Sequence, residues 1–260
     1  MLFYDEEEVP LLEKLLGPAI YNPFHTPAIE VGSKRSSELV ILVHGWMSGQ
    51  AHLQQFSDYL KNTQGYSVYR LELPTTFGSL ENLIDEVESQ LKAIDYGKTF
   101  KDVHFVGHSF GGLIIRGILA RYKEPNIRSV VTIGSPFQGS NLAARLVDRM
   151  PILANLSWSV KNAKKIQEIS DKAKINPKIK VGLIAGIKSY SIADIGETEF
   201  QMRIGVFQSV NDGTVEKYSA FGWNGPVIDK TTFKCNHIEL ILDKKVWKAT
   251  SNFLQKNKFR

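Results

Sequence analysis

The amino-acid sequence predicts an α/β fold, in which helices cover both faces of a mostly parallel central sheet of about six strands. Short apolar runs alternate with longer segments whose apolar residues recur at helical spacing, and this alternation is typical of successive βαβ units. The short runs are apolar almost throughout, as expected of parallel strands that are buried on both faces. A chain of 260 residues suits one such domain over 1–260.

The strands are expected where apolar and β-branched residues cluster. The first run, at 39–43, is continuously apolar and ends at a His-Gly pair, which predicts a buried parallel strand. Further strands are expected at "YSVYRLEL", "DVHFVG", "RSVVTIG" and "KVGLIAG". Two later segments also resemble strands, "RIGVFQS" and "TTFKC".

Helices are expected between these strands. The clearest is a stripe with a 3.6-residue period formed by Leu80, Leu83, Ile84, Val87, Leu91 and Ile94. A shorter helix is expected near 53–60, and an amphipathic helix near 246–254. The segment 113–122 is apolar nearly all round, which predicts a buried helix.

Two segments depart from this alternation. Residues 1–37 are punctuated by prolines, which predicts an irregular N-terminal arm. The insertion 141–177 is longer than a crossover needs, and Leu142, Leu146 and Met150 share one helical face within it. We therefore expect a helical cap over the carboxyl end of the sheet. Its many lysines are interpreted as a solvated face, with transient attraction to an anionic lipid surface as the alternative.

Composition excludes several classes of function. The net charge of +5 comes without a basic patch interleaved with aromatic residues, so no nucleic-acid partner is expected. The single cysteine, Cys235, excludes an intramolecular disulfide. No His, Asp or Glu cluster has metal-ligand spacing, so neither a metal nor another cofactor is expected. The acidic start "MLFYDEEEVP" lacks the pattern of a secretory signal, and a cytoplasmic location is therefore expected.

One serine stands between glycines at a strand-to-helix junction. The segment "GHSFG" at 107–111 matches G-x-S-x-G directly after an expected strand and directly before an expected helix, which is the context that a nucleophile elbow requires. The N-terminal N–H groups of that helix favour negative charge developing at the same place. We therefore predict that Ser109 is a catalytic nucleophile.

Five segments, taken in order, resemble those of α/β-hydrolases of the bacterial lipase and esterase type: "LVILVHGW", "FVGHSFGG", "TIGSPFQGS", "NDGTV" and "CNHIELI". The resemblance covers about 39–254 and implies an oxyanion hole built from the main-chain N–H groups of Trp46 and Phe110. It departs from the family pattern at Phe137-Gln138, where such a loop usually carries a histidine after the proline.

The resemblance and the chain order both point to His237 as the general base, because it is the histidine that follows the serine late in the chain. The acid is expected between serine and histidine. Asp212, in a turn with a glycine, is favoured over its rivals Asp194 and Asp229. In such a triad the histidine takes the serine proton, and the aspartate fixes the imidazole tautomer.

The expected activity is hydrolysis of carboxylic esters with apolar acyl chains through an acyl-enzyme, as in lipases and esterases. Met47, Phe137 and the apolar face of the cap are expected to line the acyl site. The substrate is then a small-molecule acyl ester or lipid, and no obligate protein partner is expected. A thioesterase or acyltransferase would use the same triad, and a binding protein that has lost catalysis would share the fold.

Overall fold

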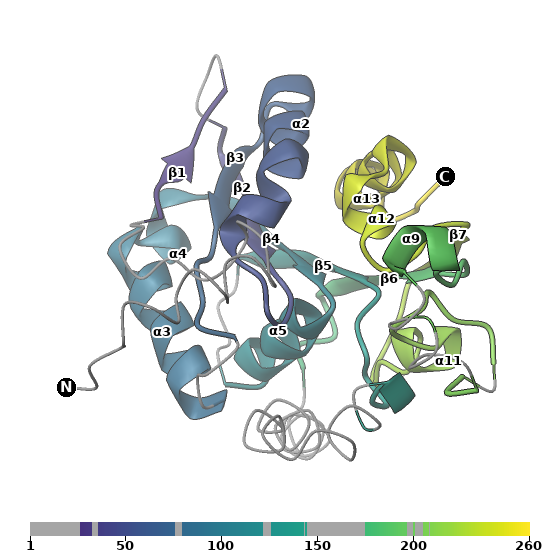
Figure 1. The fold of residues 1–260 in the computed structure, drawn as a ribbon. Helices are drawn as coiled ribbons and strands as arrows, with labels where there is room; N and C mark the ends of the chain where they lie inside the picture. The colour runs from purple at the N-terminus through teal and green to yellow at the C-terminus, as the bar shows by residue number, and fades with distance from the viewer. Residues whose placement is uncertain are drawn as a thin grey trace, which may run out of the picture.

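The computed structural model describes residues 27–32, 36–75, 80–121, 126–142, 144, 175–196, 200, 205–207 and 209–260. Within these residues a seven-stranded sheet has the order β1-β3-β2-β4-β5-β6-β7 (Figure 1). Its strands are β1 (Ile29–Glu30), β2 (Glu38–Val43), β3 (Ser67–Arg70), β4 (Asp102–His108), β5 (Ile127–Ile133), β6 (Lys180–Gly186) and β7 (Asp229–Phe233). Strands β2 to β7 are parallel, and β1 runs antiparallel to β3.

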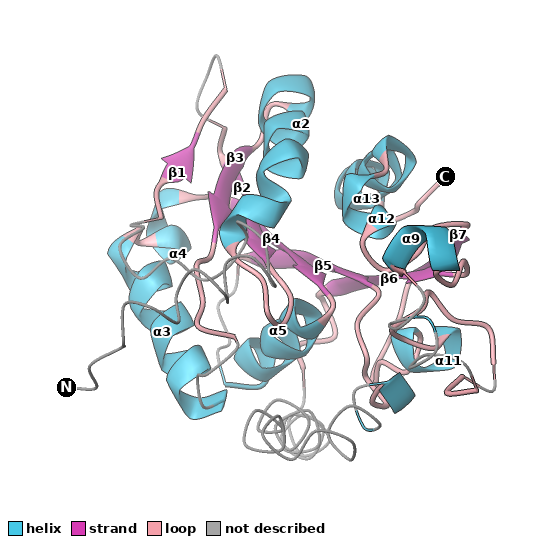
Figure 2. Cartoon of the chain, in the orientation of Figure 1, coloured by secondary structure: helices cyan, strands magenta, loops and turns pink. Residues whose placement is uncertain are grey.

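Helices cover both faces of the sheet (Figure 2). One face carries α2 (Gln54–Gln64), α12 (Glu239–Leu242) and α13 (Lys244–Lys256), and the other carries α3 (Leu80–Ala93) and α5 (Phe110–Arg121). Shorter elements complete the described chain: η1 (Gln50–Leu53), α4 (Tyr96–Thr99), α9 (Ile192–Ile195) and α11 (Lys217–Ala220). The predicted α/β class, the six parallel strands and the two helical layers are confirmed.

Strand β4 lies at the centre of this arrangement and divides the core in two. Phe105 packs in the cluster that includes α3 and α5, whereas Val106 packs in the cluster that includes α2 and α13. Because side chains alternate along a strand, His104 and His108 lie on the same face as Val106. Both histidines therefore point toward the layer that contains α2 and α13.

The structure corrects the sequence prediction in two places. Residues Ile29–Glu30 lie in the arm that was expected to be irregular, yet they form the edge strand β1. The Glu30 carboxylate anchors this strand by contacting Arg70 and Lys61. In the segment "RIGVFQS", residues 205 and 206 lie in a turn and residue 209 in a bend, and residue 207 also lies outside any strand. Strands β6 and β7 pair directly with each other, so the segment forms no strand between them.

The helix that was expected to be apolar nearly all round contains a fully buried cation. Arg116 in α5 is 1% exposed, and its guanidinium lies 5.8 Å from the ring centroid of Phe137 and 5.5 Å from that of Trp223. Contact with two aromatic faces favours a guanidinium at a site that water does not reach. In the described portion of the chain, no helix is long and apolar enough to cross a membrane.

Candidate active site

Ser109 lies on the sharp turn that joins β4 to α5. Its φ angle is 53°, a left-handed conformation that is uncommon for residues other than glycine and that clusters at functional sites. Its main-chain N–H donates to the Ile133 carbonyl at 2.9 Å. Any side chain at Gly111 would overlap the carbonyl oxygen of Val43, so the glycine lets the start of α5 approach the end of β2. The turn leaves the Ser109 side chain partly exposed.

The loop after β2 approaches this serine. A Cβ atom added to Gly45 would lie 3.0 Å from the Cβ atom of Ser109, and Met47 adopts a second left-handed φ angle of 51°. Trp46 and Met47 are both partly exposed. Phe110 opens α5, where the first N–H groups of a helix have no partner within the helix. The predicted oxyanion residues therefore lie on the two segments next to Ser109: Trp46 in the loop after β2 and Phe110 at the start of α5.

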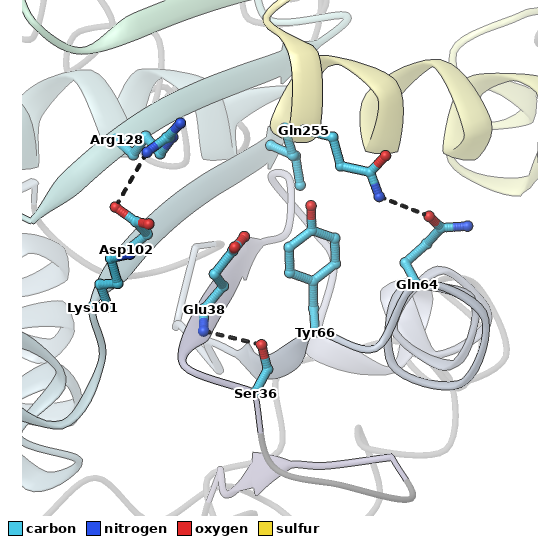
Figure 3. Close-up of a pocket in the computed structure, with 9 residues that line it drawn as sticks. Ser36, Glu38, Gln64, Tyr66, Lys101, Asp102, Arg128 and Gln255 are labelled. Carbon is cyan, nitrogen blue, oxygen red and sulfur yellow. Dashed lines mark hydrogen bonds and ion pairs between the residues drawn. The ribbon is translucent and has the colours of Figure 1, made fainter.

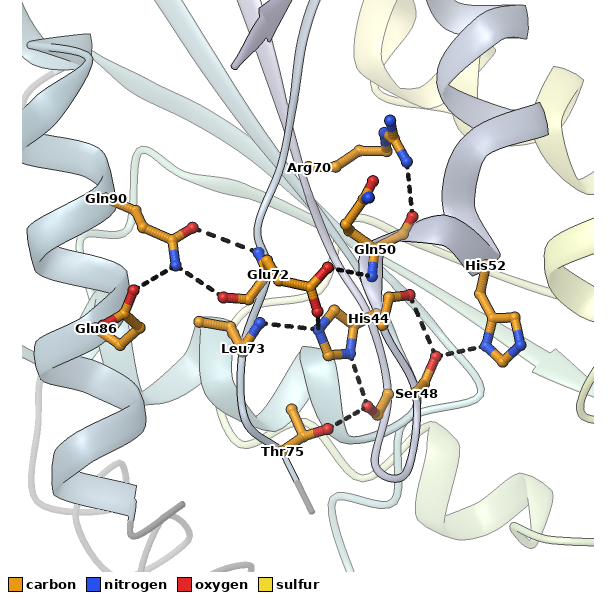
Figure 4. Close-up of polar contacts among 12 residues, drawn as sticks. His44, Ser48, Gln50, His52, Arg70, Glu72, Leu73, Thr75, Glu86 and Gln90 are labelled. Carbon is orange, nitrogen blue, oxygen red and sulfur yellow. Dashed lines mark hydrogen bonds and ion pairs between the residues drawn. The ribbon is translucent and has the colours of Figure 1, made fainter. Parts of the chain in front are cut away.

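His44 fixes this loop through hydrogen bonds at both ring nitrogens (Figure 4). Its Nδ1–H donates to the Gly45 carbonyl at 2.9 Å, and its Nε2 accepts the Leu73 N–H at 3.1 Å. Burial lowers the pKa of His44 to about 4, so the imidazole is neutral and can accept at one nitrogen while donating at the other. The Thr75 hydroxyl donates to the same Gly45 carbonyl at 2.9 Å. The loop is therefore fixed to the segment that follows β3.

That segment is in turn tied to α3. Gln90 donates to the Glu72 carbonyl at 2.8 Å, and the Glu72 carboxylate accepts the Gln50 N–H at 3.3 Å (Figure 4). No role was expected for Glu72, Thr75 or Gln90 from the sequence. Glu72 lies in the expected strand "YSVYRLEL" and Gln90 in the expected helix, but neither is part of a motif that indicates chemistry. Only the proximity of Thr75 to the end of a strand could have drawn attention to it.

Asp212 and His237 form a buried pair. The distance between His237 Nδ1 and Asp212 Oδ2 is 2.8 Å, and the two residues are 6% and 1% exposed. The second oxygen, Asp212 Oδ1, accepts the N–H groups of Thr214 at 3.0 Å and Val215 at 2.7 Å. The His237 N–H also donates to the Asp212 carbonyl at 2.9 Å. The carboxylate is thus held with one oxygen directed at the imidazole.

The pair lies at the carboxyl end of the parallel strands, beside the serine turn. A Cβ atom added to Gly134, the residue after β5, would lie 3.2 Å from Asp212 Oδ2 and 3.3 Å from His237 Nδ1. The ring of His108, which precedes the serine, is 4.7 Å from that of His237. Ligands of open α/β sheets bind at this edge.

The rival carboxylates have other partners. Asp194 is exposed and accepts from the N–H and the hydroxyl of Ser191 at the start of α9. Asp229 is the first residue of β7 and so lies at the amino ends of the strands, away from the serine turn. Its Oδ2 accepts the Phe259 N–H at 2.9 Å. These contacts account for both side chains without His237.

The residues predicted to bind substrate differ in how the structure places them. Phe137 is 1% exposed and its ring packs edge-on against Trp223, so it belongs to the core beneath the site rather than to an open surface. Leu142 is 4% exposed. Leu146, Met150 and most of the cap segment lie outside the described residues.

Cys235 lies two residues before His237 and is 4% exposed. Burial, together with the nearby Asp243 carboxylate that accepts from the thiol, raises the pKa of the thiol to about 12. Across the described ranges, no three His, Cys, Asp or Glu side chains are grouped so that they could hold a metal ion.

A hollow of about 410 Å³ lies away from these residues, at the amino ends of the parallel strands (Figure 3). This amino edge of the sheet is the end opposite the serine turn. Its lining is polar and includes Glu38, Tyr66, Asp102 and Arg128. It contains none of the residues that the sequence selected for catalysis.

The arrangement of strands, serine turn and buried acid–base pair defines an α/β-hydrolase. The mature lipase BlEst2 of Bacillus licheniformis superposes with a TM-score of 0.69 at 20% identity, over 90% of this chain and 98% of its own. The meta-cleavage product hydrolase of Pseudomonas fluorescens superposes with a TM-score of 0.53 at 15% identity, over 93% and 98%. At such identities the likeness shows the fold alone.

Sequence comparison identifies the family. The family model of palmitoyl protein thioesterase matches residues 39–176, more than half of the chain, which therefore belongs to the palmitoyl protein thioesterase family. The lysosomal thioesterase PPT2-B of Xenopus laevis is 28% identical over 131 residues, 49% of this chain and 46% of its own length. The lysosomal thioesterase PPT2 of Rattus norvegicus is 30% identical over 120 residues, 45% and 40%. The match spans less than half the length of these relatives.

Proposed function

We propose that this protein is a serine hydrolase that cleaves carboxylic esters of apolar acyl chains, with Ser109 as nucleophile, His237 as base and Asp212 as acid. The main support is the 2.8 Å contact between His237 and Asp212 beside a serine held at a φ angle of 53°. A buried imidazole that donates to a carboxylate presents its other nitrogen as a base.

In the proposed reaction, His237 Nε2 takes the proton of Ser109 while the serine oxygen attacks the acyl carbonyl. Asp212 accepts from Nδ1–H throughout and stabilises the imidazolium. The N–H groups of Trp46 and Phe110 bind the oxyanion, and each such donor is worth about 10² to 10³ in kcat. The imidazolium then protonates the leaving group, and water, activated by the same histidine, releases the acid from Ser109.

A thioester substrate is the second candidate, because the family match and the names of the relatives both favour it. The triad chemistry is the same, with a thiol as the leaving group in place of an alcohol. In either case we place the acyl chain against Met47, Leu142 and the cap segment 141–177, including Leu146 and Met150. A transient contact of the cap with a lipid surface belongs to the same proposal.

A cytoplasmic location stays a prediction of the sequence. The names of the relatives place those proteins in the lysosome, so fractionation of cells that produce this chain is the direct check.

A fluorophosphonate probe tests the nucleophile. We expect it to label Ser109 in the wild type and to leave Ser109→Ala unlabelled, with unchanged melting temperature. Labelling of a different serine would refute the assignment. Hydrolysis of p-nitrophenyl esters and of acyl thioesters, each in a series of graded acyl length, then identifies the bond and the preferred chain. Comparable rates in the wild type and Ser109→Ala would show that the hydrolysis does not depend on Ser109 and would refute the proposed mechanism.

A further inference from the structure

His108 lies between the nucleophile and the base. It directly precedes Ser109 in the chain and is 6% exposed. Its Nε2 lies 3.0 Å from the main-chain carbonyl of His237, and the two imidazole rings are 4.7 Å apart. The mechanism above gives this histidine no part in proton transfer.

The other side of the His108 ring faces the oxyanion loop. A Cβ atom added to Gly45 would lie 3.5 Å from His108 Nδ1 and 3.0 Å from Ser109 Cβ. The His108 imidazole therefore adjoins three segments: the serine turn, the loop with Trp46, and the segment with His237. These are the segments whose relative positions decide whether the proposed reaction can proceed.

The hydrogen-bond partner fixes the tautomer of His108. A carbonyl oxygen can only accept, so Nε2 must carry the proton. Burial, with the nearby His237 as the next cause, holds the pKa of His108 well below its ordinary value. The ring is therefore neutral, and its single N–H is committed to the main chain.

We propose that His108 is a positioning residue that sets the separation between Ser109 and His237 through its Nε2–H bond to the His237 carbonyl. This inference rests on the proposed function. The His237 backbone is held on its N–H side by the Asp212 carbonyl at 2.9 Å and on its carbonyl side by His108. Loss of the second bond leaves the base anchored to the acid but not to the nucleophile. A displacement of about 1 Å can cost about a hundredfold in rate.

Three variants separate the hydrogen bond from the shape of the ring. Glutamine places its Nε2 the same number of bonds from Cβ as histidine Nε2, whereas asparagine reaches only the position of Nδ1, and methionine fills similar space without a donor. We expect His108→Met and His108→Asn to lower kcat by about tenfold or more with little change in KM. We expect His108→Gln to recover most of that loss. The rate of fluorophosphonate labelling at Ser109 should follow kcat across the series.

The downfield proton resonance of the His237 Nδ1–H group gives a readout that needs no turnover. It should stay sharp in the wild type and His108→Gln and broaden in His108→Met. Equal kcat in all three variants, or equal loss in His108→Gln and His108→Met at matched melting temperatures, would overturn the proposal. If the wild type neither labels nor hydrolyses, the proposed function fails, and the resonance alone then decides whether His108 holds His237.

Discussion

Strand β4 carries one histidine near each end, His104 and His108, on the same face of the sheet. At the amino end, His104 is fully buried, and its partners are side chains: the Ser129 hydroxyl at 2.6 Å from Nδ1 and the Glu38 carboxylate at 3.4 Å from Nε2. At the carboxyl end, the partner of His108 is the main chain of His237. The two residues therefore share a strand and a degree of burial but differ in what they hold.

The difference shows at which end of the strand a histidine contact restrains the backbone. A side-chain partner such as Glu38, whose side chain is 42% exposed, can turn away into solvent without moving the backbone. A main-chain partner cannot, so the His108 contact transmits any displacement to the base. The polar hollow beside Glu38 (Figure 3) thus borders a tolerant edge of the sheet, whereas the opposite edge is built from contacts that fix the backbone.

The largest expected effect is at the acid. Asp212→Asn keeps the size of the side chain but favours the wrong tautomer of His237, and the same change lowers kcat by about 10⁴ in a serine protease with such a triad. We expect turnover of the preferred ester or thioester to fall by at least about a hundredfold, with little change in melting temperature.

The matched controls are Asp194→Asn and Asp229→Asn, which we expect to stay within about tenfold of the wild type. Asp229→Asn should instead lower the melting temperature, because its carboxylate accepts the Phe259 N–H. A large loss of turnover in Asp194→Asn would assign the acid to Asp194 and leave the assignments of Ser109 and His237 unchanged.

A smaller effect is expected at Thr75. Thr75→Val removes one of the two donors to the Gly45 carbonyl and leaves the His44 donor in place. We expect kcat to fall by about fivefold, as for loss of one neutral hydrogen bond, with KM unchanged because the substrate is not contacted. Thr75→Ser, which keeps the hydroxyl, should restore the rate. A change in KM alone would show that Thr75 acts on substrate binding instead.

The oxyanion loop also predicts a dependence on pH. His44 has a pKa of about 4 in the folded protein against an ordinary 6.5, so the unfolded chain binds more protons between these values. The free energy of unfolding should therefore decrease as the pH falls from 6.5 to 4, by about 3 kcal/mol at most from this group. Urea unfolding across that range should show a shallower decrease for His44→Gln. Parallel curves for the two proteins would mean that another group controls the acid limb.

The smallest expected effect is at the amino edge. The neighbouring His104 imidazole, whose Nε2 lies 3.4 Å from the Glu38 carboxylate, lowers the pKa of Glu38 below its ordinary 4.5. The stabilisation from Glu38 is therefore present above pH 4.5 and is lost as the pH falls through the lowered value. Because the group is exposed, Glu38→Gln should lower the melting temperature at pH 7 by about 2 °C or less, with unchanged turnover. The two melting curves should converge in acid. A loss of turnover above about twofold would contradict the inference that changes at Glu38 do not reach the active site.

The sequence predicted the elements whose signals extend over many residues. Six parallel strands, the long helices and the strand–serine–helix junction all recur or span several positions. Ser109 was predicted from that junction, whereas His237 and Asp212 were predicted from chain order together with the resemblance to α/β-hydrolases. The two-residue strand β1 is too short to show a period, and the contact between Thr75 and Gly45 joins residues 30 positions apart. Arg116 was hidden because a cation inside an apolar helix gives no sign of its aromatic neighbours.

The burial of Cys235 makes the protein well suited to assays and labelling that use thiol reagents. A thiol with a pKa of about 12 is almost entirely protonated at neutral pH and is a poor nucleophile there. Colorimetric reagents that report the thiol released from a thioester should therefore read with little background from the enzyme itself. Because the chain has one cysteine, a second one introduced in the segment 141–177 would be the single reactive attachment point for a fluorophore, without first removing the native residue.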